Sequence, residues 1–273
     1  KWQYLGYSIN GGLSWNEGTD NFITAVTENG VGAVTDQPGV VTINNPLIDM
    51  RAKRIEQMRQ ATPPTGVKDL SLDENGRQST ANCYVITAPG TYSFPLVYGN
   101  AIENGNDNPS SYKTSNTGTR ILRNFQDHEG HDIDDPWIEK SHGGANNGVD
   151  GAEVVWADAA NLVHSPSIKR DANNDAFLEF EVKASDIQSG NAVVAVTKSN
   201  GASKTVVWSW HLWFAPKDAL STIAVTNYQG KTYNFTKETL GWKLVLWNGS
   251  TYSSARTVKV KVEQTVANNS TKK

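Results

Sequence analysis

From residue 82 onward the chain is a succession of short segments rich in β-branched and aromatic residues, separated by stretches of glycine, asparagine, aspartate and serine. The segments lie at residues 83–87, 92–97, 120–125, 153–156, 177–182, 192–197, 206–214, 222–227, 242–247 and 257–266. No hydrophobic pattern of helical period lies between them, and strands at this spacing form antiparallel sheets instead of βαβ units. The sequence therefore predicts an all-β fold: an antiparallel β-sandwich of the jelly-roll or immunoglobulin-like type, preceded by a small β segment and one short helix.

The segment at residues 257–266 shows the clearest alternation. Val258, Val260 and Val262 fall on one face of an extended strand, and charged residues fall on the other. This pattern predicts a strand with one covered face and one solvated face. We expect an internal strand of the sandwich domain, although the same alternation would suit a donor strand in pilus assembly.

The part of the chain before residue 80 differs from the rest. Its first residues form short β segments, and an independent sandwich usually needs about 100 residues, so we expect a small or truncated immunoglobulin-like module there. One helix follows, because Pro46 suits the first helical position and Pro63 stops the helix. The expected organisation is a β module over residues 1–49, a helix and connector over residues 50–79, and the large sandwich over residues 80–273.

Charge and cysteine content exclude several classes of partner and site. The chain has 25 Lys and Arg against 28 Asp and Glu, a net charge of −3, so no basic field attracts nucleic acid or an anionic membrane. Cys83 is the only cysteine, which excludes an intrachain disulfide and a cysteine-based zinc site. No apolar run of about 18 residues is present. Any contact with a membrane is therefore expected to use an anchor that this chain does not contain.

The densest polar cluster occupies residues 127–135, with the sequence DHEGHDIDD. Its oxygen ligands could hold calcium, and His128 with His131 could begin a zinc site. However, the spacing matches no calcium loop, and the two histidines do not form a helical HExxH motif. We expect a solvated loop with no metal and no cofactor.

The most unusual string is VVWSWHLWF at residues 206–214. On a strand, Trp208 and Trp210 share one face with Leu212, while Trp213 shares the other with His211. The first interpretation is a central strand buried on both sides, with the polar side chains hydrogen-bonded inside. The second places Trp213 on an exposed face as a stacking platform for sugar rings, with His211 as its polar neighbour.

Three further tryptophans, Trp2, Trp15 and Trp137, have polar flanks and are better candidates for such platforms. No catalytic residue is predicted. The chain has no GxSxG motif, Cys83 lies in an apolar segment that indicates an inert buried thiol, and a glycosidase carboxylate pair is defined by a separation that sequence does not give.

Several segments occur together in an order that carries a resemblance. They are TANCYVI (residues 80–86), PGTYSFPLVYGN (89–100), ILRNF (121–125), DPWI (135–138), VWAD (155–158), NLV (161–163), GNAVVAV (190–196) and WSWHLW (208–213). Over residues 60–265 the chain resembles the fimbrillin-like adhesin proteins of the Bacteroides cell surface. Its first fifty residues are weakly similar to the BACON-type immunoglobulin-like modules. The resemblance implies export as a lipoprotein to the outer cell surface and a role in attachment or pilus building, and it implies no catalytic residue.

Three functional hypotheses follow. The first is a non-enzymatic adhesion or pilus-type structural protein that presents the long loops at residues 100–116 and 127–151 to a surface glycan or protein, with neighbouring surface subunits as partners. The second is a carbohydrate-binding module of a polysaccharide-utilisation system. The third is a hydrolase, which requires two carboxylates or a serine and a histidine converging in a cleft.

Overall fold

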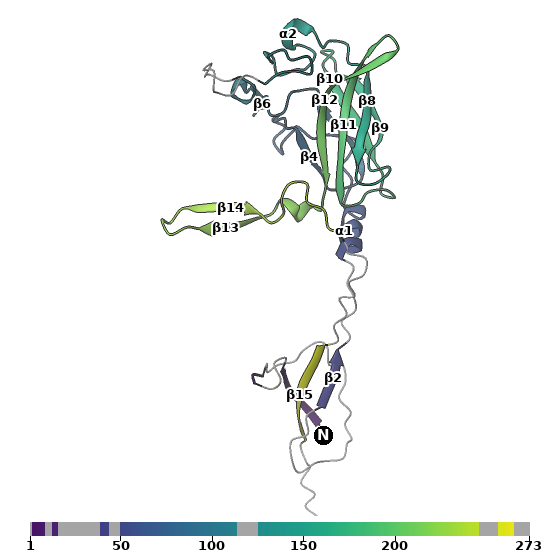
Figure 1. Cartoon of the computed structure of the whole chain (residues 1–273). Helices are drawn as coiled ribbons and strands as arrows, with labels where there is room; N and C mark the ends of the chain where they lie inside the picture. Colours follow the sequence, from purple (N-terminus) through teal and green to yellow (C-terminus); the bar gives the residue numbers. More distant parts are fainter. Residues whose placement is uncertain are drawn as a thin grey trace, which may run out of the picture. The chain divides into compact units, whose positions relative to one another are not determined.

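The computed structural model describes residues 2–8, 13–15, 39–43, 50–113, 125–245 and 256–264 (Figure 1). The chain divides into two compact units. One contains residues 1–48 and 247–273, and the other contains residues 49–246. Among the described residues, no helix combines the length and the apolar character needed to cross a membrane.

The unit of residues 49–246 is a sandwich of two four-stranded sheets. The first sheet has the order β3 (Val67–Asp69), β5 (Gly90–Pro95), β10 (Ala176–Val182) and β9 (His164–Arg170). The second has the order β4 (Cys83–Ile86), β12 (Ser203–Phe214), β11 (Gly190–Asn200) and β8 (Gly151–Ala157). The predicted all-β sandwich is confirmed. Its pairings are antiparallel except at β3 with β5 and at β4 with β12, which are parallel.

Aromatic side chains from both sheets fill the space between them. Phe94 on β5 is fully buried, and its ring centroid lies 4.9 Å from that of Tyr84 on β4 and 5.0 Å from that of Trp210 on β12. On β10, alternate residues from Ala176 to Val182 are buried, as expected for a strand with one face in a core. Burying each large side chain of this kind contributes roughly 1.5–3 kcal/mol to folding.

Strand β12 is buried on both faces near its end, which confirms the first interpretation of residues 206–214. Trp210 and Trp213 are 1% and 0% exposed although they point to opposite faces. The expected alternation fails only at the start of this segment, where Val207 is buried and Val206 is 44% exposed. The cause is a register shift opposite Val196, because an extra residue in a bulge reverses the direction of the side chains that precede it.

The predicted helix is confirmed as α1 (Met50–Arg59), and Met58 is fully buried in the sandwich core. The helix and its connector therefore belong to the sandwich unit. Arg54 also fastens α1 to a later part of the same unit, because its guanidinium binds the carboxylate of Glu238 through two hydrogen bonds of 2.6 and 2.8 Å. The predicted start of the helix, at Pro46, lies outside the described residues.

The alternating C-terminal segment is a strand, β15 (Arg256–Gln264), but it is not part of the sandwich. It pairs antiparallel with β1 (Trp2–Ser8) on one side and β2 (Gly39–Ile43) on the other, in a three-stranded sheet of the other unit. The predicted domain of residues 80–273 is therefore corrected at its C-terminal end. Alternation shows that one face of a strand is covered, but it does not identify the strands with which it pairs. Residues 242–245, which were predicted to begin a strand, are not in one.

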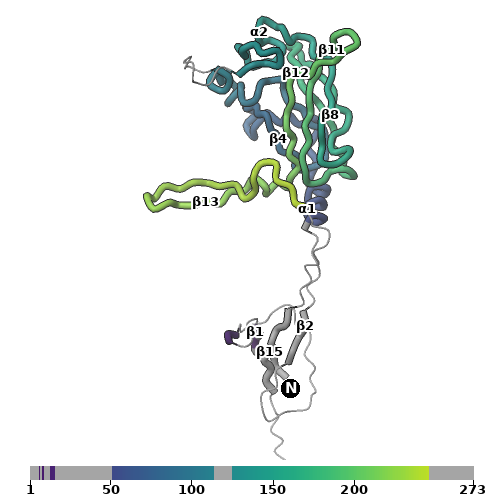
Figure 2. Tube along the Cα trace, in the orientation of Figure 1, coloured from purple at the N-terminus to yellow at the C-terminus, as the bar shows by residue number. Residues whose placement is uncertain are grey.

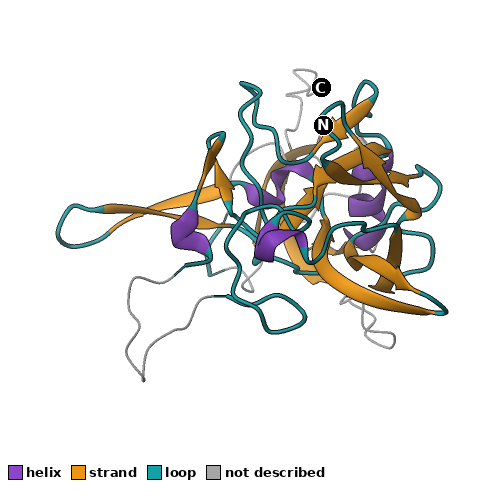
Figure 3. Cartoon of the chain, turned by 90° about the horizontal axis from the view of Figure 1, so that it is seen from above, coloured by secondary structure: helices purple, strands orange, loops and turns teal. Residues whose placement is uncertain are grey.

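Smaller elements extend from the sandwich. They are β6 (Ile102–Glu103), β7 (Asn106–Asp107), η1 (Pro109–Ser111), α2 (Ser141–Gly144), η2 (Lys217–Leu220), β13 (Thr222–Thr226) and β14 (Thr232–Thr236). Strands β13 and β14 form a hairpin that projects from the sandwich, as the traces in Figures 1 and 2 show. Figure 3 shows from a second direction that the hairpin stands apart from the layered strands.

Candidate functional site

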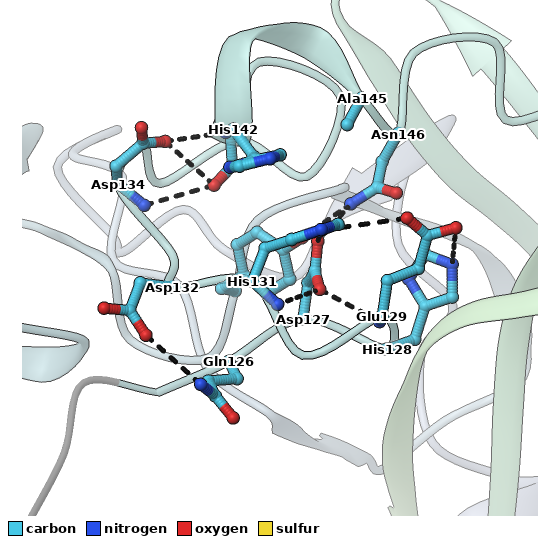
Figure 4. Close-up of polar contacts among 12 residues, drawn as sticks. Gln126, Asp127, His128, Glu129, His131, Asp132, Asp134, His142, Ala145 and Asn146 are labelled. Carbon is cyan, nitrogen blue, oxygen red and sulfur yellow. Dashed lines mark hydrogen bonds and ion pairs between the residues drawn. The ribbon is translucent and has the colours of Figure 1, made fainter.

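The long loop that holds the predicted acidic cluster is ordered by its own polar groups (Figure 4). We call residues 125–146 the acid–histidine loop. Asp127 is only 8% exposed, and its Oδ1 accepts hydrogen bonds of 2.9 Å from the backbone N–H groups of Glu129 and His131. Its Oδ2 accepts a bond of 3.2 Å from Nδ2 of the buried Asn146. One carboxylate thus connects the beginning of the loop to its end.

A second carboxylate repeats this role. Oδ1 of Asp134 accepts a hydrogen bond of 2.7 Å from the backbone N–H of His142 and one of 3.1 Å from the hydroxyl of the buried Ser141. The bond from the His142 backbone keeps the pKa of Asp134 below its ordinary value. At Asp127, burial acts to raise the pKa, but the N–H donors of His131 and Glu129 outweigh it and the pKa is lowered.

The histidines of the loop contact one another and the loop's own carboxylates. The rings of His131 and His142 are stacked, with centroids 4.0 Å apart and planes 5° from parallel. Nδ1 of His131 lies 3.4 Å from Oδ2 of Asp127, a carboxylate that already accepts other hydrogen bonds. In the part of the chain that the structure describes, no group of three or more His, Cys, Asp or Glu residues could hold a metal ion. The carboxylates of Asp127 and Asp134 hold the loop together.

Trp137 lies within this loop and is half-buried. Its backbone pairs with Val97 in an isolated bridge, and Oδ1 of Asp135 accepts its backbone N–H at 2.8 Å. The ring meets Phe177 of β10 edge to face at 6.1 Å, and the ammonium group of Lys140 lies 4.7 Å from its centroid. These contacts hold the indole in one orientation at the rim of the sandwich.

A cavity of about 190 Å³ opens beside this ring, and we call it the Trp137 pocket. Its lining combines apolar, amide and charged side chains: Leu96, Trp137, Glu139, Lys140, Asn147, Asn173, Asn174, Asp175 and Ala176. The three asparagines are exposed, and within the described residues their side-chain amides bind no other group of the protein. Asn147 directly follows the acid–histidine loop, and Asn173 and Asn174 lie in the turn between β9 and β10. Sequence reasoning found the tryptophan but not these amides, because residues 147 and 173 are far apart along the chain.

The charged residues of the pocket are paired with one another or with neighbours. Lys140 Nζ lies 2.6 Å from Oδ1 of Asp175. Arg170 donates two hydrogen bonds of 2.8 Å to the Glu139 carboxylate, which also accepts the backbone N–H groups of Gly148 and Val149. Burial acts to raise the pKa of Glu139, but the hydrogen bonds from Arg170, Val149 and Gly148 together outweigh it, and the pKa is lowered. The pocket is therefore held by ion pairs and carries little net charge.

Trp213 and His211, two other predicted ligand residues of the same unit, do not line this pocket. Trp213 is fully buried and donates its Nε1–H to the carbonyl of Trp242 at 2.9 Å, so the prediction that it is a stacking platform is wrong. Ala215 and Ala219, together with the partly buried Cys83 and Val85 of β4, cover the face that alternation alone left open. Trp15 is 40% exposed but belongs to the other unit. The backbone of Trp2 lies in β1, and its side chain lies outside the described residues.

His211 is partly buried between two polar partners instead of facing a ligand. Its Nε2 lies 2.8 Å from Oδ1 of Asn191 and its Nδ1 lies 3.2 Å from Sγ of Cys83. Because the Asn191 amide nitrogen donates to the Gly241 carbonyl, its oxygen faces the imidazole, and Nε2 of His211 is the protonated nitrogen. Burial raises the pKa of Cys83 to about 11 and lowers that of His211. Both groups are neutral at pH 7, which is expected of a structural thiol and imidazole.

Comparison with known proteins finds no match: no protein-family model matches the chain, and neither a curated protein nor a solved structure does. The resemblance to fimbrillin-like adhesins and to BACON-type modules therefore stays a prediction.

The lowered carboxylate pKa values predict a loss of loop order in acid. The ordinary pKa of a carboxyl group is about 4. When folding lowers this pKa, the ionised carboxylate stabilises the folded chain at any pH above about 4, and this stabilisation is lost as the pH falls through the lowered pKa. Asp127, Asp134 and Glu139 all shift in this direction. Hydrogen exchange of residues 125–150 is therefore expected to be slow at pH 6 and to accelerate below about pH 4, relative to β11, after correction for intrinsic rates. Equal protection of this loop at pH 6 and pH 3 would contradict the prediction.

Proposed function

We propose that this chain is a non-enzymatic adhesion module of a bacterial outer cell surface, and that it attaches to a surface glycan through the Trp137 pocket. The observation that carries the proposal is the pocket itself, in which one oriented indole lies beside three exposed amides that bind no other group among the residues that the structure describes. An apolar ring with a few convergent polar groups is the usual composition of a small-ligand site. The adhesive role, the outer-surface location and the pilus-type assembly with neighbouring subunits follow from the resemblance stated above.

The chemistry of the pocket suits a sugar. The C–H face of a pyranose packs against an aromatic ring, while its hydroxyl groups both donate to amide oxygens and accept from amide nitrogens. A sugar that stacks on the face of Trp137 covered by the Lys140 ammonium group takes the place of that group. The Lys140 side chain is 48% exposed, and a surface ion pair of this kind contributes only about 0–1 kcal/mol. Displacing it therefore costs little.

The size of the pocket favours the end of a glycan. Its volume of about 190 Å³ is below the range of roughly 300–1,000 Å³ that drug-sized ligands occupy. One sugar ring matches this space better than the interior of a long polysaccharide chain. A carbohydrate-binding module of a polysaccharide-utilisation system is the second candidate, because the same lining of aromatic and amide groups supports it.

The carboxylates of the loop fit a hydrolase poorly. Asp127, Asp134 and Glu139 each accept hydrogen bonds that lower their pKa values. A general acid in glycoside hydrolysis needs a raised pKa so that it holds a proton near neutral pH. We therefore assign these three carboxylates a structural role, in which they hold the loop of the binding module together.

The proposal is tested by measuring the binding of the full chain to a glycan array and to intact cells. Trp137→Ala is expected to weaken binding at least about tenfold, because a central aromatic residue of an interface contributes about 1.4 kcal/mol or more. The matched control is Trp156→Ala, which removes a tryptophan that is 51% exposed on β8 and does not line the pocket.

Binding that Trp137→Ala leaves unchanged, or that both variants lose equally, would overturn the proposed site. Binding to soluble polysaccharide interiors without binding to cells or to terminal sugars would support the second candidate instead.

A further inference from the structure

One carboxylate of the sandwich unit binds both an amine and a carboxamide. Oδ1 of Asp158 lies 2.9 Å from Nζ of Lys243. Oδ2 of Asp158 accepts two hydrogen bonds from Asn191, one of 2.8 Å from the backbone N–H and one of 2.9 Å from Nδ2. Asp158 directly follows β8, Asn191 lies in β11, and Lys243 lies after β14. Three distant parts of the chain therefore bring a nucleophile, an amide carbon and a proton-accepting group to one point.

Backbone contacts hold the segment that carries Lys243 over Asn191. Nδ2 of Asn191 also donates to the carbonyl of Gly241 at 3.0 Å, and a Cβ atom at Gly241 would lie only 3.3 Å from Oδ1 of Asn191. The next carbonyl, that of Trp242, accepts the Nε1–H of the buried Trp213 at 2.9 Å. Trp213 and Asn191 are paired residues of β12 and β11. These contacts place the stem of the Lys243 side chain beside the Asn191 carboxamide.

The Asn191 carboxamide is polarised at both of its ends. Its Oδ1 faces Nε2 of His211 at 2.8 Å, and this imidazole is neutral because burial lowers its pKa. A donor aimed at a carbonyl oxygen stabilises the negative charge that develops there during nucleophilic attack. At the other end, Nδ2 faces Asp158. Burial acts to raise the pKa of Asp158, but its bonds with Lys243 and Asn191 outweigh burial and the pKa is lowered, so this carboxylate is ionised and can accept a proton.

We propose that an amide bond forms between the side chains of Lys243 and Asn191, with Asp158 as the proton carrier. Asp158 takes a proton from the Lys243 ammonium group, and the neutral Nζ attacks Cγ of Asn191. The bond from Cγ to Nδ2 breaks as Asp158 passes its proton to Nδ2, and the second proton that Nζ loses leaves with the ammonia as ammonium. One N–C bond forms and one breaks, and no atom is oxidised or reduced. The step needs no co-reactant.

The position of this link gives it a mechanical role. Lys243 lies just before the point at which the chain leaves the sandwich unit for residues 247–273. A partly exposed ion pair such as that of Lys243 with Asp158 contributes little to holding this end of the unit, whereas an amide bond to β11 does not dissociate. Because the groups are held together in one folded chain and react only once, even a slow reaction goes to completion. None of these residues lines the Trp137 pocket, so this proposal and the glycan proposal can fail separately.

Mass spectrometry of the denatured full chain tests the link. We expect the wild-type mass to be lower than that of the sequence by one ammonia molecule. Lys243→Arg keeps a cation for Asp158 but has no primary amine, and Asp158→Asn removes the proton carrier, so both variants are expected to keep the full mass of their sequences. The matched control is Lys198→Arg, which replaces a lysine of β11 whose Nζ donates to the carbonyl of Ala145, and which is expected to lose ammonia like the wild type.

A second measurement uses only the wild-type chain and does not depend on how a variant folds. In a tryptic digest we expect a branched peptide in which the Lys243 side chain is joined to the peptide that contains Asn191. A wild-type chain that keeps the full mass of its sequence after prolonged incubation would overturn the proposal. An ammonia loss that persists in Lys243→Arg would also overturn it, because an asparagine that closes on its own backbone to a succinimide loses ammonia without any lysine.

Discussion

Phe94→Ala is expected to lower the free energy of unfolding of the sandwich unit by about 3–5 kcal/mol. Phe94 is completely buried, and its ring contacts aromatic side chains of three other strands, namely Tyr84 on β4, Phe180 on β10 and Trp210 on β12. Removing the ring loses the free energy gained by transferring a large apolar side chain from water to the core. It also leaves a cavity, and the surrounding aromatic rings of both sheets cannot easily move to fill it. The effect is large because the Phe94 ring packs against side chains of both sheets.

The measurement is guanidinium unfolding followed by near-ultraviolet circular dichroism, which reports on the packed aromatic side chains. Phe125→Ala provides the matched control, since this phenylalanine is 64% exposed and its loss is expected to change stability by less than about 0.5 kcal/mol. Equal effects of the two substitutions would mean that the aromatic cluster does not join the sheets.

Asp127→Ala is expected to destabilise the acid–histidine loop by about 2–4 kcal/mol. The substitution removes the acceptor of the backbone N–H groups of Glu129 and His131. It also removes one of the two acceptors of the Asn146 side-chain amide, which keeps its bond to the Tyr98 hydroxyl. A buried donor that loses its partner costs about 1–3 kcal/mol, and water reaching the loop recovers part of that cost. Because Trp137 lies in the same loop, the variant is also expected to lose glycan binding although the tryptophan is intact.

Hydrogen exchange and limited proteolysis of residues 125–150 measure this effect. Asp127→Asn keeps an oxygen acceptor for the two backbone N–H groups, so it is expected to preserve the loop better than alanine and to weaken its sensitivity to acid. Glu129→Ala serves as control, because the Glu129 side chain is 56% exposed. Normal protection of the loop in Asp127→Ala would contradict its assigned role.

Sequence patterns predicted the class of fold well because short β-branched runs and turn residues act locally. They placed the helix that begins at Met50 and most strands of the sandwich, including the two-sided burial of β12 at Trp210 and Trp213. They could not assign β15 to its sheet, because its partners β1 and β2 lie more than two hundred residues away along the chain. The bulge at Val207 was also missed, since a register shift leaves no mark in the hydrophobic pattern.

The candidate site was predictable only in part. The polar flanks of Trp137 indicated an accessible ring, and the structure places it beside a pocket. The interpretation that placed Trp213 on an exposed strand face was wrong, because its strand is covered on both faces. The contact of Cys83 with His211 had no signal in the sequence, because it depends on the parallel pairing of β4 with β12.

The most direct test of the central claim is a hydrogen-exchange footprint of the full chain with and without a glycan that it binds. The account predicts that added glycan protects residues 137–147 and the turn at residues 171–176, which together line the Trp137 pocket, and leaves the β13–β14 hairpin unchanged. Protection confined to any other surface, or no saturable protection with any glycan of a broad panel, would contradict it.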